Sequence, residues 1–223
     1  MKKFILIALM CIVASIILYN PLIDYLAKQS AKPEGFIGKI FTQIWSSYFD
    51  DLSKWTIENT KIEENFKILE VGYGGGVNIK NLAESNKDLI IYGADISEES
   101  YKTASKLNKT FIDNGEVILS IEDVAEMTYQ DNSFDLVFAI QNHMYWAETK
   151  KGFEEIYRVM SDNSVLIISS EKDKIDYHMD NYKTTESLTA LLKSIGFADV
   201  TAKETENRIL YTVYKTDSNT PTE

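Results

Sequence analysis

The segment spanning residues 67–76 constrains the fold of this chain more than any other, and it reads K-I-L-E-V-G-Y-G-G-G. Its first half predicts a buried strand, and the glycines that follow indicate a tight turn. A helix-like segment, Val77–Ser85, comes directly after the turn. A glycine turn between a strand and a helix lets a nucleotide-like ligand lie against bare backbone N–H groups at the start of the helix. A dinucleotide fingerprint would need glycine where Val77 stands, so the spacing argues against that class of site, and a tight turn without a ligand is the alternative.

Apolar strands alternate with helices along the rest of the chain. Beyond the first strand, the expected strands are Leu89–Ala94, Val117–Ser120, Phe134–Ile140, Val165–Ser170, Val200–Thr205 and Arg208–Lys215, and the expected later helices are Glu98–Phe111, Lys150–Met160 and Thr185–Ile195. This alternation predicts an α/β, Rossmann-like fold with a mostly parallel sheet and helices on both faces. The last two strands are separated by little more than a turn, so we expect them to be antiparallel.

Ligands bind such sheets at the carboxyl ends of the strands, and three of these ends carry suggestive residues. The glycine turn follows the first strand, Asp95 follows the second, and Asp123 lies beyond the third. The carboxylate of Asp95 can accept hydrogen bonds from two vicinal ribose hydroxyls. It lies 23 residues after Gly72, near the spacing of roughly 20 that nucleotide-binding folds show. Asp95 therefore indicates nucleoside binding in general.

Several motifs in order resemble those of the class I S-adenosylmethionine (SAM) dependent methyltransferases. They are E-x-G-x-G-x-G at residues 70–76, the stretch Glu122–Asp135, the stretch Phe138–Trp146 after the fourth strand, and Phe153–Met160. The resemblance covers about residues 33–215 and is greatest to the small enzymes of the ubiquinone/menaquinone-biosynthesis type. It implies the seven-stranded strand order and SAM as cofactor. One departure is Ser161–Ser164, which replaces the usual K-P-G-G turn.

The resemblance also implies which residues bind the cofactor. They are Glu70, Gly72, Tyr73, Gly74, Gly76, Asp95, Ile96, Asp123, Val124 and Gln141. In the family the glycines admit the methionine part of SAM, and the acid at position 70 orders the loop and reaches the amino end of the ligand. Asp123 matches the acid that receives the adenine amino group, and Val124 supplies a backbone N–H to the ring. A turn acid without a ligand is the alternative for Asp123.

Methyl transfer from a sulfonium is an in-line displacement, so positioning can supply most of the catalysis. Some acceptors also need a base, and we expect His143 to be that base, with packing against Trp146 as the alternative. Tyr145 and Trp146 are expected to form an aromatic wall, and His178 is expected in a surface loop. The acceptor is expected to be a small or lipid-like molecule. A SAM-binding protein without turnover and a nucleotide-dependent oxidoreductase or epimerase are the other classes considered.

The charge distribution argues against nucleic acid as a partner. The net charge is −11, the first 42 residues carry +3, and the remainder therefore carries −14 with only two arginines. A strongly acidic domain without a basic stripe is a poor match for DNA or RNA. One cysteine and two histidines are too few for a metal site. Nothing in these patterns indicates an oligomeric state.

The N-terminus predicts a membrane segment. Two lysines precede Phe4–Tyr19, which has no charge and would span about 24 Å as a helix. We expect residues 1–27 to be a single-pass membrane anchor with the catalytic domain on the cytoplasmic side; a cleaved signal and a hydrophobic leading helix are the alternatives. Residues 28–66 are expected to form a linker and lid helices, residues 67–217 the SAM-binding domain, and residues 218–223 a polar tail.

Overall fold

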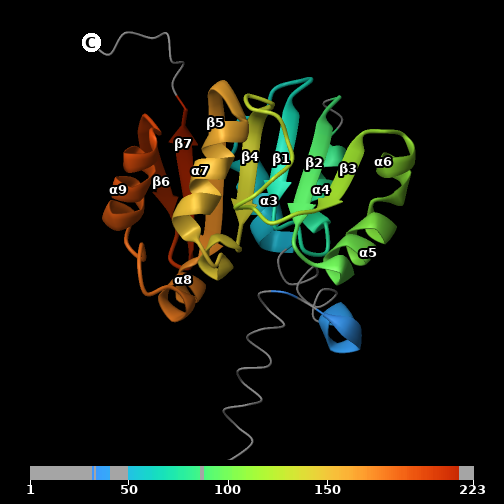
Figure 1. The fold of residues 1–223 in the computed structure, drawn as a ribbon, viewed down its shortest axis with the longest axis horizontal. Helices are drawn as coiled ribbons and strands as arrows, with labels where there is room; N and C mark the ends of the chain where they lie inside the picture. The colour runs from blue at the N-terminus through green and yellow to red at the C-terminus, as the bar shows by residue number, and fades with distance from the viewer. Residues whose placement is uncertain (1–31, 33, 41–49, 86–87, 216–223) are drawn as a thin grey trace, which may run out of the picture.

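A seven-stranded sheet forms the centre of the protein in a computed structural model that describes residues 32, 34–40, 50–85 and 88–215 (Figure 1). The strand order is β3-β2-β1-β4-β5-β7-β6. The strands are β1 (Lys67–Val71), β2 (Ile90–Asp95), β3 (Val117–Ile121), β4 (Phe134–Ile140), β5 (Met160–Glu171), β6 (Asp199–Glu204) and β7 (Arg208–Tyr214). Strands β1 to β5 are parallel, and β7 is antiparallel to both β5 and β6. The expected Rossmann-like sheet with an antiparallel end is confirmed.

Helices cover both faces of this sheet (Figure 1). They are α3 (Asp50–Glu58), α4 (Val77–Ala83), α5 (Glu98–Leu107), α6 (Lys109–Asp113), the short 3-10 helix η1 (His143–Tyr145), α7 (Thr149–Val159), α8 (Lys172–His178) and α9 (Thr185–Ile195). Alternate residues of β1 enter different cores. Ile68 packs with Ile79 and Leu82 of α4, whereas Leu69 packs on the other face with Phe153 and Ile156 of α7. The period of two along a strand thus divides the core into two layers.

Local sequence signals explain most of the helix boundaries. The side chain of Ser97 accepts a hydrogen bond from Ser100 N and so caps α5, as expected. Helix α9 begins after Thr184 with a capping box and ends at Gly196, whose φ is 127°. The helix expected over residues 98–111 is instead two helices that meet at Asn108. The amide of Asn108 donates to Ala104 O and to Gly76 O, both at 3.0 Å, which ties this break to the glycine turn.

The segment after β5 corrects one expectation. His178 was expected in a surface loop, but it is the last residue of α8. This helix begins directly after β5, a strand of twelve residues. Because β5 ends at the same edge of the sheet as β1 and β4, α8 lies beside the loop that follows β4.

Helix α3 docks on the sheet through buried polar contacts. The hydroxyl of Thr56 is hydrogen-bonded to Leu52 O at 2.8 Å and to Ser169 Oγ of β5 at 2.7 Å, and Leu52 is 1% exposed. The linker and lid helices expected over residues 28–66 are described only in part, as a helix at residues 35–40 and as α3; residues 41–49 lie outside the described part of the chain.

The prediction of a membrane-anchored protein is corrected by the structure. In the part of the chain that the structure describes, no helix has both the length and the apolar character needed to cross a bilayer. A single-pass anchor, and the placement of the domain at the cytoplasmic side that depended on it, are therefore not supported. The predicted segment itself, residues 1–27, lies outside the described residues.

Candidate functional site

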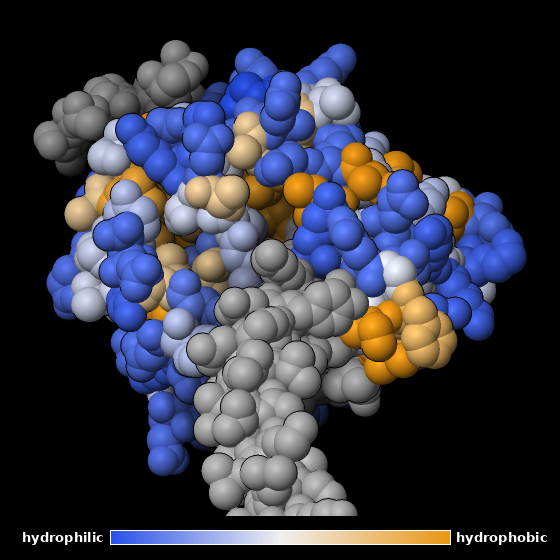
Figure 2. Space-filling model, turned by 60° about the horizontal axis from the view of Figure 1, so that its bottom comes forward, coloured by the Kyte–Doolittle hydropathy of each residue, from blue (hydrophilic) through white to orange (hydrophobic). Residues whose placement is uncertain are grey.

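A cavity of about 350 Å³ opens at the carboxyl ends of the strands. Its walls come from the glycine turn after β1, the ends of β2 and β4, the loop after β3, and the helices η1, α3, α4, α5 and α8. Figure 2 shows this edge of the molecule, where a largely hydrophilic surface surrounds a hollow in which apolar side chains are visible. The cavity therefore lies where open α/β sheets bind their ligands.

Three of the four glycines of the turn have left-handed backbones, with φ of 65° at Gly72, 51° at Gly74 and 79° at Gly76. A Cβ at Gly72 would lie 2.6 Å from Asn142 Nδ2, and one at Gly76 would lie 2.7 Å from Ala104 Cβ. A Cβ at Gly74 would meet no atom within 4 Å. Gly72 and Gly74 line the cavity, as does Gly75, which the sequence did not single out, whereas Gly76 lies behind the turn. Two of the glycines are thus required by packing, and Gly74 leaves open space beside the cavity.

Glu70 lies at the base of the cavity and is 3% exposed. Burial raises the pKa of its carboxyl to about 8; the Asn78 side chain opposes the rise and the negative charge of Asp95 adds to it. Its Oε2 atom has no hydrogen-bond partner among the described residues. A buried carboxyl with an unused oxygen is a ready partner for a cation that enters the cavity.

Asp95 at the end of β2 holds the glycine turn. Its Oδ2 accepts from Gly74 N at 2.8 Å and its Oδ1 accepts from Ser97 N at 2.9 Å. Burial raises the pKa of this carboxyl, against the lowering effect of the two backbone N–H groups. A carboxylate has about four lone-pair sites, so each oxygen keeps one for a ligand. Ile96, the next residue, also lines the cavity and is 41% exposed.

The remaining cofactor residues expected near β3 lie along one wall. Asp123 and Val124 line the cavity from the loop after β3. Asp123 Oδ1 also accepts from Ala125 N at 2.9 Å, which is the turn role that the sequence left as an alternative. The same residue lines the cavity, so the turn role and a binding role are compatible. Tyr73 is 4% exposed and donates from its hydroxyl to Ser120 O at 3.0 Å, and burial raises its pKa.

Arg158 of α7 fixes the loop that carries Asp123. Its guanidinium forms ion pairs with Glu155 and Asp131, both at 2.6 Å. It also donates to the carbonyl oxygens of Met127 at 3.1 Å and Tyr129 at 2.8 Å. One planar fork thus satisfies two loop carbonyls and two carboxylates, which holds the loop against α7.

Two adjacent amides after β4 line the cavity, and the first of them, Gln141, has a left-handed backbone. Gln141 has a φ of 54°, is 7% exposed, and accepts from Glu171 N at 2.8 Å through Oε1, while its Nε2 has no partner among the described residues. Asn142 donates to Val71 O, and its Oδ1 is likewise without a partner there. Strained backbone with unused buried polar atoms is typical of a binding site.

These unpaired atoms converge on the cavity. Buried side-chain atoms that have no hydrogen-bond partner in the described residues and belong to cavity-lining residues are Glu70 Oε2, Asn78 Nδ2, Ser100 Oγ, Gln141 Nε2 and Asn142 Oδ1. Leaving such a group unpaired costs roughly 1–3 kcal/mol. The set contains both donors and acceptors, so it fits a polar ligand with an amino group, a carboxylate and hydroxyls.

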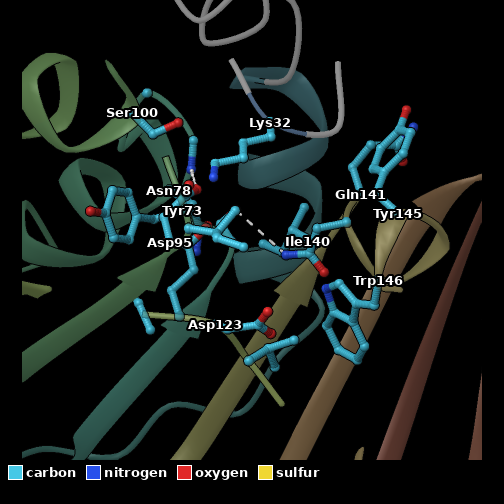
Figure 3. A pocket seen from close by; sticks show the side chains of 18 of the residues that line it. Lys32, Tyr73, Asn78, Asp95, Ser100, Asp123, Ile140, Gln141, Tyr145 and Trp146 are labelled. Carbon is cyan, nitrogen blue, oxygen red and sulfur yellow. Dashed lines mark hydrogen bonds between the residues drawn. The ribbon is translucent and has the colours of Figure 1, made fainter. Parts of the chain in front are cut away.

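The other side of the cavity is aromatic. Tyr145 and Trp146 line it after β4, and Figure 3 shows them across the cavity from Asp95 and Asn78. The ring of His178 lies 4.7 Å from the Tyr145 ring, and burial lowers the pKa of His178, followed by the effect of the Lys174 charge. Burial also raises the pKa of Tyr145 to about 12. His178, which the sequence expected in a surface loop, thus lines the cavity.

His143 is placed differently from the expectation. It is 1% exposed, does not line the cavity, and its ring lies 6.4 Å from that of Trp146 and 6.5 Å from that of Phe153. Burial lowers the pKa of His143 to about 4, and its Nδ1 has no partner among the described residues. This placement favours the packing role that the sequence left open beside catalysis.

The burial of His143 predicts a loss of stability in acid. Its folded pKa of about 4 lies below the ordinary histidine value of 6.5, so its contribution to stability is present above pH 6.5 and is lost as the pH falls toward 4. The loss is on the order of 3 kcal/mol. Urea unfolding between pH 7 and pH 4 should show this loss as the difference between the parent and His143→Phe, because the raised pKa of Glu70 acts in the opposite direction over the same range in both proteins. His178→Phe is the matched control, since these two are the only histidines; an unchanged profile in His143→Phe would contradict the prediction.

Four uncharged polar residues of the site were not found from the sequence: Ser53, Asn78, Ser100 and Asn142. Asn78 lies in the first turn of α4 and Ser100 in the first turn of α5. A polar residue in the first turn of a helix that follows a ligand-binding turn is a weak signal that could have indicated both. Ser53 reaches the cavity only because α3 docks beside α4, and nothing in its local sequence indicates that.

Comparison with known proteins gives a consistent result. A family model described as "Methyltransferase domain" matches residues 62–217. The chain is 27% identical over 150 residues to the uncharacterized methyltransferase YdaC of Bacillus subtilis, covering 67% of this chain and 81% of the relative. It is 27% identical over 181 residues to the ubiquinone/menaquinone biosynthesis C-methyltransferase UbiE of Rickettsia akari, covering 72% and 69%. A solved SAM-dependent methyltransferase from Aquifex aeolicus superposes with a TM-score of 0.66 at 17% identity, covering 79% and 97%.

Proposed function

This chain belongs to the SAM-dependent methyltransferase family, and we propose that it moves the methyl group of SAM to a small-molecule acceptor held beside Tyr145, Trp146 and His178. The observation that carries the proposal is the convergence of unpaired buried polar atoms on a cavity that is bordered by the glycine turn. The residues present fit SAM, because its amino, carboxylate and ribose hydroxyl groups can satisfy both the donors and the acceptors of this set.

We assign the parts of the cofactor to residues as follows. Glu70 and Asn142 receive the amino end, since both present unused oxygen atoms. Asp95 accepts from the ribose hydroxyls with its remaining lone pairs. Asp123 and Val124 hold the adenine, which their place on the wall after β3 supports. Gln141 Nε2 donates to the carboxylate of the methionine part.

When bound, SAM supplies a methyl group that its positive sulfur already activates. The chain's own contribution is then to align the acceptor and exclude water. Tyr145 and Trp146 hold the acceptor against the cofactor, and their faces also attract a sulfonium cation. His178 accepts a proton from an acceptor that has one to lose, since its lowered pKa leaves it neutral near pH 7. We place His143 in the supporting core behind Trp146.

The organisation of the chain follows from this assignment. Residues 67–217 form the SAM-binding domain, residues 28–66 supply a linker and the lid helices, and residues 218–223 are a polar tail. The family match over residues 62–217 supports the domain bounds. A lipid-like acceptor was expected chiefly from the membrane anchor, and it loses that support with the corrected anchor.

The proposal is tested by calorimetric titration of the full chain with SAM between pH 6 and pH 8.5. A cationic amino group favours ionised Glu70, so we expect the affinity to rise with pH until about 8, by up to about tenfold per pH unit. Glu70→Gln should weaken binding and remove this rise. Release of S-adenosylhomocysteine with candidate acceptors then separates an enzyme from a SAM-binding protein without turnover.

The matched control for Glu70→Gln is Glu122→Gln. Glu122 also lines the cavity, but both of its oxygens are occupied by Thr128, at 2.8 Å from N and 2.9 Å from Oγ1. We expect it to keep the pH dependence of the parent. Absence of SAM binding by the folded chain would reject the proposed function, and pH-independent binding would reject the role of Glu70.

A further inference from the structure

Helix α3 precedes the glycine turn in sequence, yet it reaches the same cavity through a row of polar side chains. Ser53 of α3 donates from Oγ to Asn78 Oδ1 of α4 at 2.8 Å, and both side chains line the cavity. Asn81 of α4 donates from Nδ2 to Ser53 Oγ at 2.9 Å and to Asp50 Oδ1 at 3.0 Å. Four side chains on two helices are thus linked in one row, from Asp50 near the surface to Asn78 beside the cavity.

Each link of this row has only one permitted direction. Hydrogen bonds from Lys54 and then Asn81 lower the pKa of Asp50, so it is an ionised group that only accepts. Asn81 must therefore turn its Nδ2 toward Asp50, and the second hydrogen of that nitrogen goes to Ser53. The hydroxyl of Ser53 has a single hydrogen. Because its oxygen already accepts from Asn81, that hydrogen points to Asn78 Oδ1.

The row ends at Asn78, which lines the same cavity as the motif acid Glu70. With Oδ1 of Asn78 engaged by Ser53, the amide presents Nδ2, a pure donor, as its free end. Asn78 Nδ2 and Glu70 Oε2 are both buried and unpaired among the described residues, and the Asn78 side chain favours the ionised form of Glu70. The other titratable groups that interact with Glu70 are Asp95, which opposes ionisation, and Tyr73. Among the described residues, the Asn78 side chain acts in favour of the carboxylate.

We propose that the row Asp50–Asn81–Ser53–Asn78 is a directed hydrogen-bond chain through which docked α3 keeps Glu70 ready to bind the cofactor's amino group. Asn78 and Ser53 are then positioning residues, since they act through Glu70. The inference rests on the proposed function, because it assumes that SAM binds at Glu70. Helix α3 then does more than cover the sheet. Its hydrogen bond to Asn78 decides which end of that amide faces Glu70.

If the role of α3 were purely structural, the loss of any of its buried contacts would affect SAM binding to a similar extent. The bond from Thr56 Oγ1 to Ser169 Oγ offers the comparison, because Thr56 lies one turn after Ser53 on the same helix but does not line the cavity. Thr56→Val removes that hydroxyl at constant shape. It should therefore report what loosening α3 does when the directed chain is intact.

The test is a calorimetric titration of the full chain with SAM from pH 6 to pH 9, comparing the parent, Ser53→Ala and Thr56→Val. In Ser53→Ala the Asn78 amide is free to turn, so the pH midpoint of the affinity rise should move up by roughly half to one unit. Affinity at pH 7 should then fall by about three- to tenfold and converge with the parent at pH 9. In Thr56→Val the pH midpoint of the affinity rise should stay within about 0.2 unit of the parent midpoint, which is far less than the shift expected for Ser53→Ala.

A second variant reverses the direction of the chain. Asp50→Asn combined with Asn81→Asp exchanges the two side chains at constant net charge. The carboxylate at position 81 would then draw the Ser53 hydrogen, and Asn78 would turn its oxygen toward Glu70, which favours the protonated acid. We expect a larger upward shift of the midpoint than in Ser53→Ala.

The outcomes separate the two proposals. If the folded parent does not bind SAM, the proposed function is rejected, and with it the role of the hydrogen-bond chain in SAM binding. If the parent binds with the expected rise but the Ser53→Ala profile overlays that of Thr56→Val, the directed chain is rejected while the function stands. A shift in Ser53→Ala and in the exchanged variant, without one in Thr56→Val, supports the inference.

Discussion

Asp95→Ala is expected to weaken SAM binding by about 100-fold. The substitution removes the acceptor for Gly74 N at 2.8 Å, so the glycine turn loses its tie to the end of β2. It also removes the proposed acceptor for the ribose hydroxyls. Two hydrogen bonds to a charged group, at roughly 1.5 kcal/mol each, account for a loss of about 3 kcal/mol, which is about 100-fold in affinity. Calorimetric titration at pH 8, where binding is strongest, measures it.

Asp135→Ala is the matched control. Asp135 Oδ2 accepts from Lys67 N at 2.8 Å, so it also holds a backbone N–H next to β1, but at the end of the strand far from the cavity. Both variants should lower the free energy of unfolding by about 1–2 kcal/mol. Only Asp95→Ala should also lower the affinity for SAM. If Asp95→Ala binds SAM within threefold of the parent, Asp95 serves only to hold the backbone N–H groups of Gly74 and Ser97.

The sheet and the glycine turn could be predicted from the sequence because their signals are local. A run of apolar residues ending at Val71 and a helix starting at Val77 fix the turn between them, whatever the rest of the chain does. Asp95 was found for the same reason, since a carboxylate directly after a buried strand lies at the ligand edge of a parallel sheet. The short connection between β6 and β7 likewise allows only an antiparallel pair.

The residues that the sequence missed depend on contacts between distant segments. Ser53 and Asn78 are 25 positions apart, and Asn142 reaches Val71 across 71 positions, so no local pattern relates them. The choice between the two histidines also needed the fold. His143 lies three residues after the end of β4, which suggested the cavity, but η1 places it in the core, and α8 brings His178 to the cavity instead.

Gly76→Ala is expected to give the largest loss of stability. Gly76 has φ of 79° and ψ of 20° at the start of α4, a left-handed backbone that costs an alanine about 1 kcal/mol. The added Cβ would lie 2.7 Å from both Ala104 Cβ and Asn108 Nδ2, and 3.1 Å from the backbone atom Ala104 Cα. Because α5 cannot yield at its backbone, overpacking adds about 2 kcal/mol. Urea unfolding followed by circular dichroism should show a total loss of about 3 kcal/mol.

Variants at two other glycines separate the effect of backbone strain from the steric overlap with α5 and from the effect on ligand binding. Gly115 has φ of 80° and nothing within 4 Å of an added Cβ, so Gly115→Ala should cost only the backbone strain of about 1 kcal/mol. Gly74 has φ of 51° and the same open surroundings, but it lines the cavity. Gly74→Ala should therefore lose about as much stability as Gly115→Ala and also weaken SAM binding, because its methyl group enters the space where backbone meets ligand. Equal losses at Gly76 and Gly115 would show that α5 gives way to the methyl group, and the packing that joins the glycine turn to Asn108 would then be less rigid than the contacts indicate.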